Sequence, residues 1–129
     1  MRKLNKSNNQ FKKAITKLPL GVSSNFRYWG DDKTLYIKRG KGARIWDLDD
    51  NEYIDYRLGY GPIILGYGDS RVDQAAKDGM NIGGVFALAT ELEFEIATRI
   101  SGMVKAAELV RFSNSGTEAV MAALRIARA

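Results

Sequence analysis

The chain has 129 residues, of which 45% are apolar and 27% are charged, a balance typical of a small globular domain. It contains no Cys and no His, which excludes disulfides, thiolate chemistry and the most common side-chain general base. The net charge is +5, and no apolar run is long enough for a signal peptide or a membrane span, so we expect a cytoplasmic protein without a membrane partner.

The positive charge is concentrated at the N-terminus. Residues 1–30 carry seven Lys and Arg and no acid. A basic arm can bind nucleic acid or acidic lipid, but no known nucleic-acid-binding motif follows it, so no nucleic-acid partner is expected. We interpret residues 1–20 as a basic N-terminal helix. The helical pattern runs over 6–18, with an apolar face formed by Phe11, Ala14, Ile15 and Leu18.

Residues 21–69 are predicted to form a small antiparallel sheet followed by a glycine-rich loop. The strands are expected at 34–39, 44–48 and 52–56, and the short turns between them indicate a meander. The stretch 59–68 then contains four glycines, which is typical of a loop that bends sharply or lies against a neighbour.

Two features of this region require a choice between a binding site and ordinary structure. The acids around Asp47 and Asp49 resemble the start of a calcium loop, but Glu52 and Leu58 stand where Gly and Glu are needed, so no metal site is predicted. Arg27 lies among aromatic residues, where its planar guanidinium is able to bind a carboxylate through two hydrogen bonds. The alternative is an arginine stacked on a surface ring.

Residues 70–129 are predicted to be mainly helical. A helix is expected from about 70 to 80, and Thr90 with Glu93 forms a capping box that opens a second helix. Its apolar face is interpreted as a packing surface. That face consists of Leu92, Ile96, Ile100 and Met103. A strand at 108–113 and an alanine-rich helix suited to packing on a sheet follow.

The turn between that strand and the last helix is the candidate binding site. Ser115 is predicted as the N-cap and Glu118 completes a capping box, while Gly116 allows a ligand to approach the backbone. A helix N-terminus offers free N–H groups and partial positive charge, and Thr117 adds a hydroxyl, so the turn suits a phosphate. The alternative is a helix start that binds nothing.

Taken in order, these segments resemble the N-terminal part of a class III (fold-type I) PLP-dependent aminotransferase, in the branch similar to glutamate-1-semialdehyde 2,1-aminomutase. The resemblance covers about Gly21 to Ala129. It rests on six stretches: Gly21-Val22-Ser23-Ser24 leading to Arg27, Ala43–Asp49, Tyr53–Tyr56, Gly61–Gly66, Thr90–Glu93 and Val110–Ala119.

The resemblance implies an α/β fold in which the N-terminal helix and the three-stranded sheet precede the first strand and helix of a truncated PLP-binding large domain. By resemblance, Ser115, Gly116 and Thr117 would hold the phosphate of pyridoxal 5′-phosphate. Ser24, Arg27 and Tyr60 would bind an amino acid, amino-aldehyde or keto acid substrate. The full-length family members are usually homodimers.

The sequence also departs from the family. Tyr67-Gly68-Asp69-Ser70 replaces a His-x-His-Pro stretch, and Ala87-Leu88-Ala89 replaces Gly-Ala-Pro, so an aminomutase and a related transaminase both stay open. No Lys matches the one that binds the cofactor covalently. We therefore expect no catalytic residue in this chain and no turnover by it alone. The alternative function is a non-catalytic truncated module for dimerisation or basic-arm binding.

Overall fold

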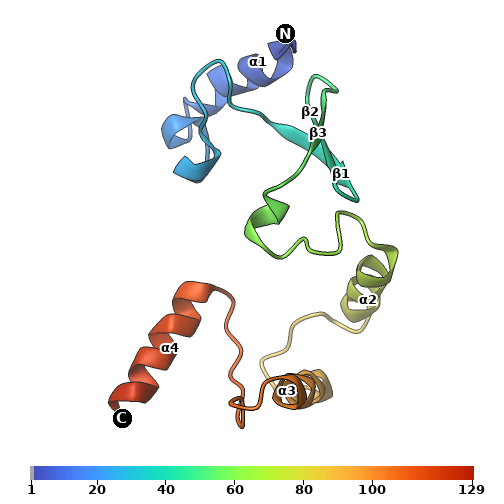
Figure 1. The fold of residues 1–129 in the computed structure, drawn as a ribbon, viewed down its shortest axis with the longest axis vertical. Helices are drawn as coiled ribbons and strands as arrows, with labels where there is room; N and C mark the ends of the chain where they lie inside the picture. Colours follow the sequence, from blue (N-terminus) through green and yellow to red (C-terminus); the bar gives the residue numbers. More distant parts are fainter. Residues whose placement is uncertain (1) are drawn as a thin grey trace. The chain divides into compact units, whose positions relative to one another are not determined.

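The computed structural model describes residues 2–129. The chain divides into two compact units, Met1–Ile82 and Gly83–Ala129. Figure 1 shows the elements of each unit in sequence colours. The helices are α1 (Asn5–Ala14), α2 (Ser70–Asn81), α3 (Glu91–Met103) and α4 (Gly116–Arg128), and the 3-10 turns are Pro19–Gly21, Asn25–Arg27 and Leu58–Tyr60. The strands are β1 (Ile37–Lys41), β2 (Arg44–Asp47) and β3 (Glu52–Ile54).

The predicted antiparallel meander is confirmed, with the strand order β1-β2-β3. Strand β1 lies further along the chain than predicted, because Gly40 and Lys41 pair with β2 instead of forming the turn. Gly42 takes a positive φ of 55°, which confines the turn to the residues between Lys41 and Arg44. The same turn exchanges two backbone hydrogen bonds with Tyr67, at 2.8 and 2.9 Å, and these tie the glycine-rich loop to the sheet.

Helix α1 is attached to the sheet through the turn between β2 and β3. The carboxylate of Asp49 accepts hydrogen bonds from the backbone amides of Lys6 and Ser7, at 2.9 to 3.0 Å, and so satisfies free donors at the start of α1. Desolvation tends to raise the pKa of Asp49, but these two amides and the charge of Lys6 bring it below its usual value. A residue 43 positions away therefore caps α1.

The side chain of Asp47 holds that turn together. It is fully buried and accepts the backbone N–H groups of Asp49 and Asn51, both at 2.9 Å. Its other oxygen accepts the Asn51 side-chain amide at 2.8 Å and the Tyr53 hydroxyl at 2.9 Å. The acids that resemble a calcium loop thus serve as acceptors for the turn and for α1.

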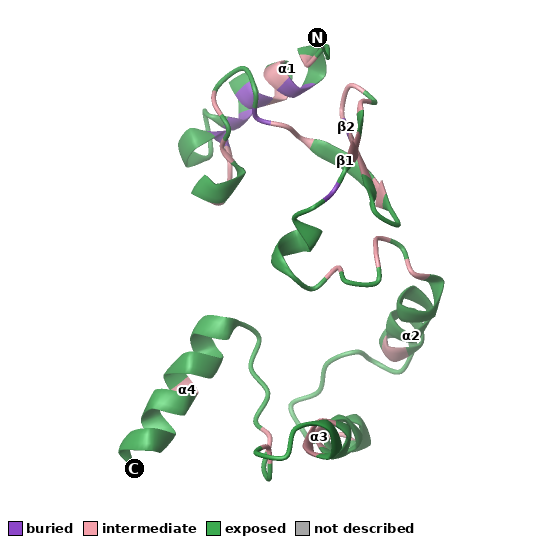
Figure 2. Cartoon of the chain, in the orientation of Figure 1, coloured by how far each residue is buried: buried purple, intermediate pink, exposed green. Residues whose placement is uncertain are grey.

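The buried apolar residues lie on α1, parts of which Figure 2 colours as buried, but the apolar face is shorter than predicted. Phe11 and Ala14 are buried, whereas Ile15 and Leu18 are 50% and 40% exposed. The prediction of a helix to residue 18 is wrong because α1 ends at Ala14, and Leu18 is extended before Pro19. Ile15 and Leu18, the last two residues of the expected apolar face, therefore lie beyond the end of α1.

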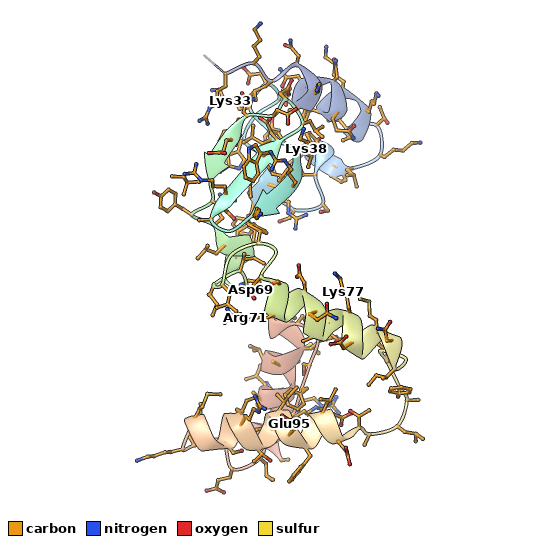
Figure 3. All side chains as sticks on the ribbon, turned by 90° about the vertical axis from the view of Figure 1, so that its right-hand side faces the viewer. Lys33, Lys38, Asp69, Arg71, Lys77 and Glu95 are labelled. Atoms are coloured by element: carbon orange, nitrogen blue, oxygen red, sulfur yellow. The ribbon has the colours of Figure 1, made fainter. Side chains whose placement is uncertain are left out.

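Helix α2 begins at a charged cap that Figure 3 labels, the pair Asp69 and Arg71. Asp69 accepts the Arg71 backbone amide at 3.0 Å and its guanidinium nitrogens at 3.1 and 2.7 Å. The guanidinium and the backbone amide of Arg71 lower the pKa of Asp69 to about 2. This cap is the predicted start of α2.

Acid is expected to loosen the start of α2 only at pH values well below the usual pKa range of Asp side chains. Because the folded pKa of Asp69 is depressed, its contribution is complete above the unfolded pKa of about 4 and is lost as the pH falls through about 2. The ¹³C shift of the Asp69 carboxyl group, followed from pH 6 to pH 1.5, measures this transition. Arg71→Gln should move the midpoint towards 4, and an unchanged midpoint would contradict the assignment.

In Gly83–Ala129 the structure departs from three predictions. Residues 108–113 do not form a strand, since no neighbouring strand pairs with them among residues 2–129. Thr90 precedes α3 in an extended conformation, but its side chain makes no capping hydrogen bond. Neither α3 nor α4 contains a buried residue. In the described chain the expected packing face of α3 is exposed at Leu92, Ile96 and Met103 and half-buried at Ile100. Every helix among residues 2–129 is too short or too polar to cross a lipid bilayer.

Candidate phosphate and carboxylate sites

The predicted cap of the last helix is present at the start of α4. The Ser115 hydroxyl accepts the Glu118 backbone amide at 3.3 Å, and the Ser115 carbonyl accepts the amide of Ala119 at 3.0 Å. Within residues 2–129 no return bond joins the Glu118 carboxylate to the Ser115 amide, so only half of the capping box forms. The hydroxyl hydrogen of Ser115 remains available to a ligand.

Two backbone donors at this helix start are left without acceptors in residues 2–129, the amides of Gly116 and Thr117. A Cβ placed on Gly116 would have no atom within 4 Å, so the space beside the Cα of Gly116 is open. A pocket is lined by residues on either side of the turn, and Ser115, Gly116 and Thr117 are not among them. Its lining consists of Arg111, Phe112, Ser113, Asn114 and Glu118. Free amides, two hydroxyls and open space at the positive end of a helix are the chemical requirements of a phosphate site.

The predicted substrate residues all belong to the other unit, Met1–Ile82, and their contacts are described within it. Arg27 is exposed and donates from Nη1 to the Ser23 hydroxyl at 2.8 Å. Ser24, which is predicted to bind the substrate together with Arg27, accepts the Arg27 amide through its backbone carbonyl at 2.9 Å. The structure therefore brings Arg27 to the hydroxyl of Ser23, and to the backbone of Ser24.

Tyr60 contacts the same loop as Arg27. Its hydroxyl lies 3.2 Å from the carbonyl oxygen of Phe26, and the two rings meet edge to face at 6.2 Å. Between them lies Arg57, whose Nη1 donates to both of these oxygens, at 2.8 Å to Phe26 and 2.7 Å to Tyr60. Sequence reasoning missed Arg57. The available signal was its position three residues before the predicted Tyr60, directly ahead of the glycine-rich stretch 59–68.

Comparison with known proteins gives one consistent family. The model of the Aminotransferase class-III family matches residues 27–129. The chain is 50% identical over 126 residues to a glutamate-1-semialdehyde 2,1-aminomutase of Sulfurihydrogenibium azorense, covering 95% of this chain and 29% of that protein.

Solved structures give the same fold. An omega-transaminase from Sphaerobacter thermophilus superposes with a TM-score of 0.86 at 35% identity, covering 93% of this chain and 27% of that one. A transaminase with PLP bound superposes with a TM-score of 0.91 at 31% identity, covering 99% and 30%. The chain thus spans less than a third of the length of these proteins. The family model covers most of this chain, which therefore belongs to the class-III aminotransferases.

Proposed function

We propose that this chain supplies the phosphate-binding turn and part of the substrate site of a pyridoxal 5′-phosphate-dependent aminotransferase or aminomutase. The observation that carries the proposal is the start of α4, where two unpaired amides and two hydroxyls lie together and the space beside Gly116 is open. In a member of this family such a turn suits the phosphate of the cofactor. The whole enzyme is proposed to be a homodimer.

Each predicted residue has a role in this proposal. The amides of Gly116 and Thr117 and the hydroxyls of Ser115 and Thr117 would donate hydrogen bonds to the phosphate oxygens. Arg27 would bind the carboxylate of an amino acid or amino-aldehyde substrate, with Ser24 in the same loop assisting and Tyr60 beside it. When bound, the cofactor supplies a conjugated ring that withdraws electrons from the amino-bearing carbon of the substrate. This chain would orient both molecules.

The phosphate site is tested with pyridoxamine 5′-phosphate, because that molecule has no aldehyde to react with surface lysines. We expect the chain to bind it more tightly than pyridoxamine, and inorganic phosphate to compete. Thr117→Ala removes one donor and should weaken binding several-fold, the equivalent of about 1 kcal/mol. Affinities are measured by ³¹P NMR or by ligand fluorescence.

Thr98→Ala is the matched control. Thr98 lies on α3 in the same unit, and its hydroxyl donates to the Phe94 carbonyl at 2.8 Å, away from the turn. The control should bind the ligand like the unmodified chain. Equal affinities for pyridoxamine and its phosphate, or no effect of Thr117→Ala, would refute the phosphate site.

A further inference from the structure

Arg57 joins two loops that are far apart in the sequence. Its Nη1 bonds the carbonyl of Phe26, 31 residues away, and the hydroxyl of Tyr60. Its guanidinium carbon also lies 4.8 Å from the ring centre of Trp29, in cation–π contact. One side chain therefore contacts both the loop that carries Arg27 and the loop that carries Tyr60.

The backbone of Arg57 is itself fixed to the end of the sheet. Its amide donates to Oδ1 of Asp55 at 2.8 Å, and Oδ2 of the same carboxylate accepts the Tyr67 hydroxyl at 2.6 Å. Asp55 is buried directly after β3. Burial tends to raise the pKa of Asp55, but the hydroxyl of Tyr67 and the Arg57 amide bring it below its usual value, which keeps the carboxylate charged. The guanidinium thus extends from a rigid point.

The loop around Tyr60 needs such support. Leu58 and Tyr60 have φ values of 50° and 66°, a left-handed conformation that non-glycine residues keep only where contacts hold them. Burial does not supply these contacts, since the side chains of Phe26, Trp29 and Tyr60 are 66%, 60% and 58% exposed. The hydroxyl of Tyr60 also donates to the Phe26 carbonyl, but at the longer distance of 3.2 Å. The shorter hydrogen bonds of Arg57, together with its cation–π contact, are therefore the stronger restraint on the position of Tyr60 against Phe26.

We propose that Arg57 is a positioning residue, which sets the distance between Tyr60 and the Arg27 loop and so shapes the carboxylate site. This inference rests on the proposed function, because it takes Arg27 as the carboxylate-binding group. Arg27 directly follows Phe26, so the hydrogen bond from Arg57 to the Phe26 carbonyl fixes the origin of the Arg27 side chain. Loss of that bond would let the two loops separate.

The test compares Arg57→Met and Arg57→Lys with the unmodified chain. Arg57→Met keeps an apolar side chain of similar length but removes the hydrogen-bond donors and the positive charge, whereas Arg57→Lys keeps the positive charge. Two quantities are measured by NMR: the nuclear Overhauser effect between the rings of Phe26 and Tyr60, and the affinity for glutamate as a carboxylate probe. Arg39→Met is the matched control, since Arg39 also stacks on a ring, 3.6 Å from the centre of Trp46, on the sheet.

Arg57→Met is expected to remove the ring–ring Overhauser effect and to weaken glutamate binding about tenfold, as loss of a charged hydrogen bond predicts. Arg57→Lys should restore part of both, and Arg39→Met should change neither. An intact Overhauser effect in Arg57→Met, with the amide signals of β2 unchanged, would overturn the positioning role. If Arg27→Met binds glutamate like the unmodified chain, the proposed carboxylate site fails instead, while the Overhauser effect still decides the role of Arg57.

Discussion

Replacing Gly116 by Asp is expected to lower the affinity of the chain for pyridoxamine 5′-phosphate at least tenfold, about 1.4 kcal/mol, while α4 stays helical. The new carboxylate would enter the open space beside Gly116, close to the free amides, and repel the phosphate. At the first position of a helix an acid is favourable, by about 0.3–1 kcal/mol, because it faces the positive end of the helix dipole. Binding should therefore be lost without loss of structure.

Fluorescence titration of the ligand and far-ultraviolet circular dichroism of the chain measure these two effects separately. Ala123→Glu is the control, because it adds one negative charge to an exposed position further along α4. It should retain most of the affinity. If both variants bind equally well, the phosphate does not occupy the start of α4, and the helix cap has only a structural role.

The start of α4 was predictable from the sequence because its chemistry is local. A Ser followed three residues later by Glu specifies a helix start whatever surrounds it, and Ser115 does cap α4. The prediction of a strand at 108–113 was wrong because a strand does not depend on local chemistry alone. A strand requires a neighbour, and its apolar residues, such as the 95% exposed Leu109, have no sheet to join among residues 2–129.

The candidate carboxylate site shows the same limit. Arg27 and Tyr60 were identifiable as residue types in suggestive loops and by resemblance to a family. Their connection was not identifiable, because it depends on Arg57 reaching a backbone carbonyl 31 residues away. Likewise, the capping of α1 by Asp49, 43 residues later, has no signature in the sequence of α1 itself. Contacts between polar groups that are far apart in the sequence leave no periodic pattern by which the sequence could reveal them.

Removal of the Asp47 carboxylate is expected to cause the largest loss of stability in Met1–Ile82. Asp47→Ala would remove the buried acceptor of four partly buried donor groups from Asp49, Asn51 and Tyr53, of which only the Asn51 side-chain amide keeps a second acceptor, the Lys3 carbonyl. Each unsatisfied buried donor costs about 1–3 kcal/mol, so we expect the free energy of unfolding to fall by about 3 kcal/mol or more. That is a large share of the stability of a small unit. Urea unfolding followed by Trp46 fluorescence on β2 measures the loss.

A graded series separates the turn from the helix that it caps. Tyr53→Phe removes one donor to Asp47 and should cost only about 1 kcal/mol. Asp49→Ala should leave the sheet folded while the amide signals of Lys6 and Ser7 shift, because only the cap of α1 is lost. Asp47→Ala should disturb both the sheet and the cap of α1, because Asp47 holds the turn that presents Asp49. If Asp47→Ala is no more harmful than Tyr53→Phe, the turn is held by its backbone and not by this carboxylate.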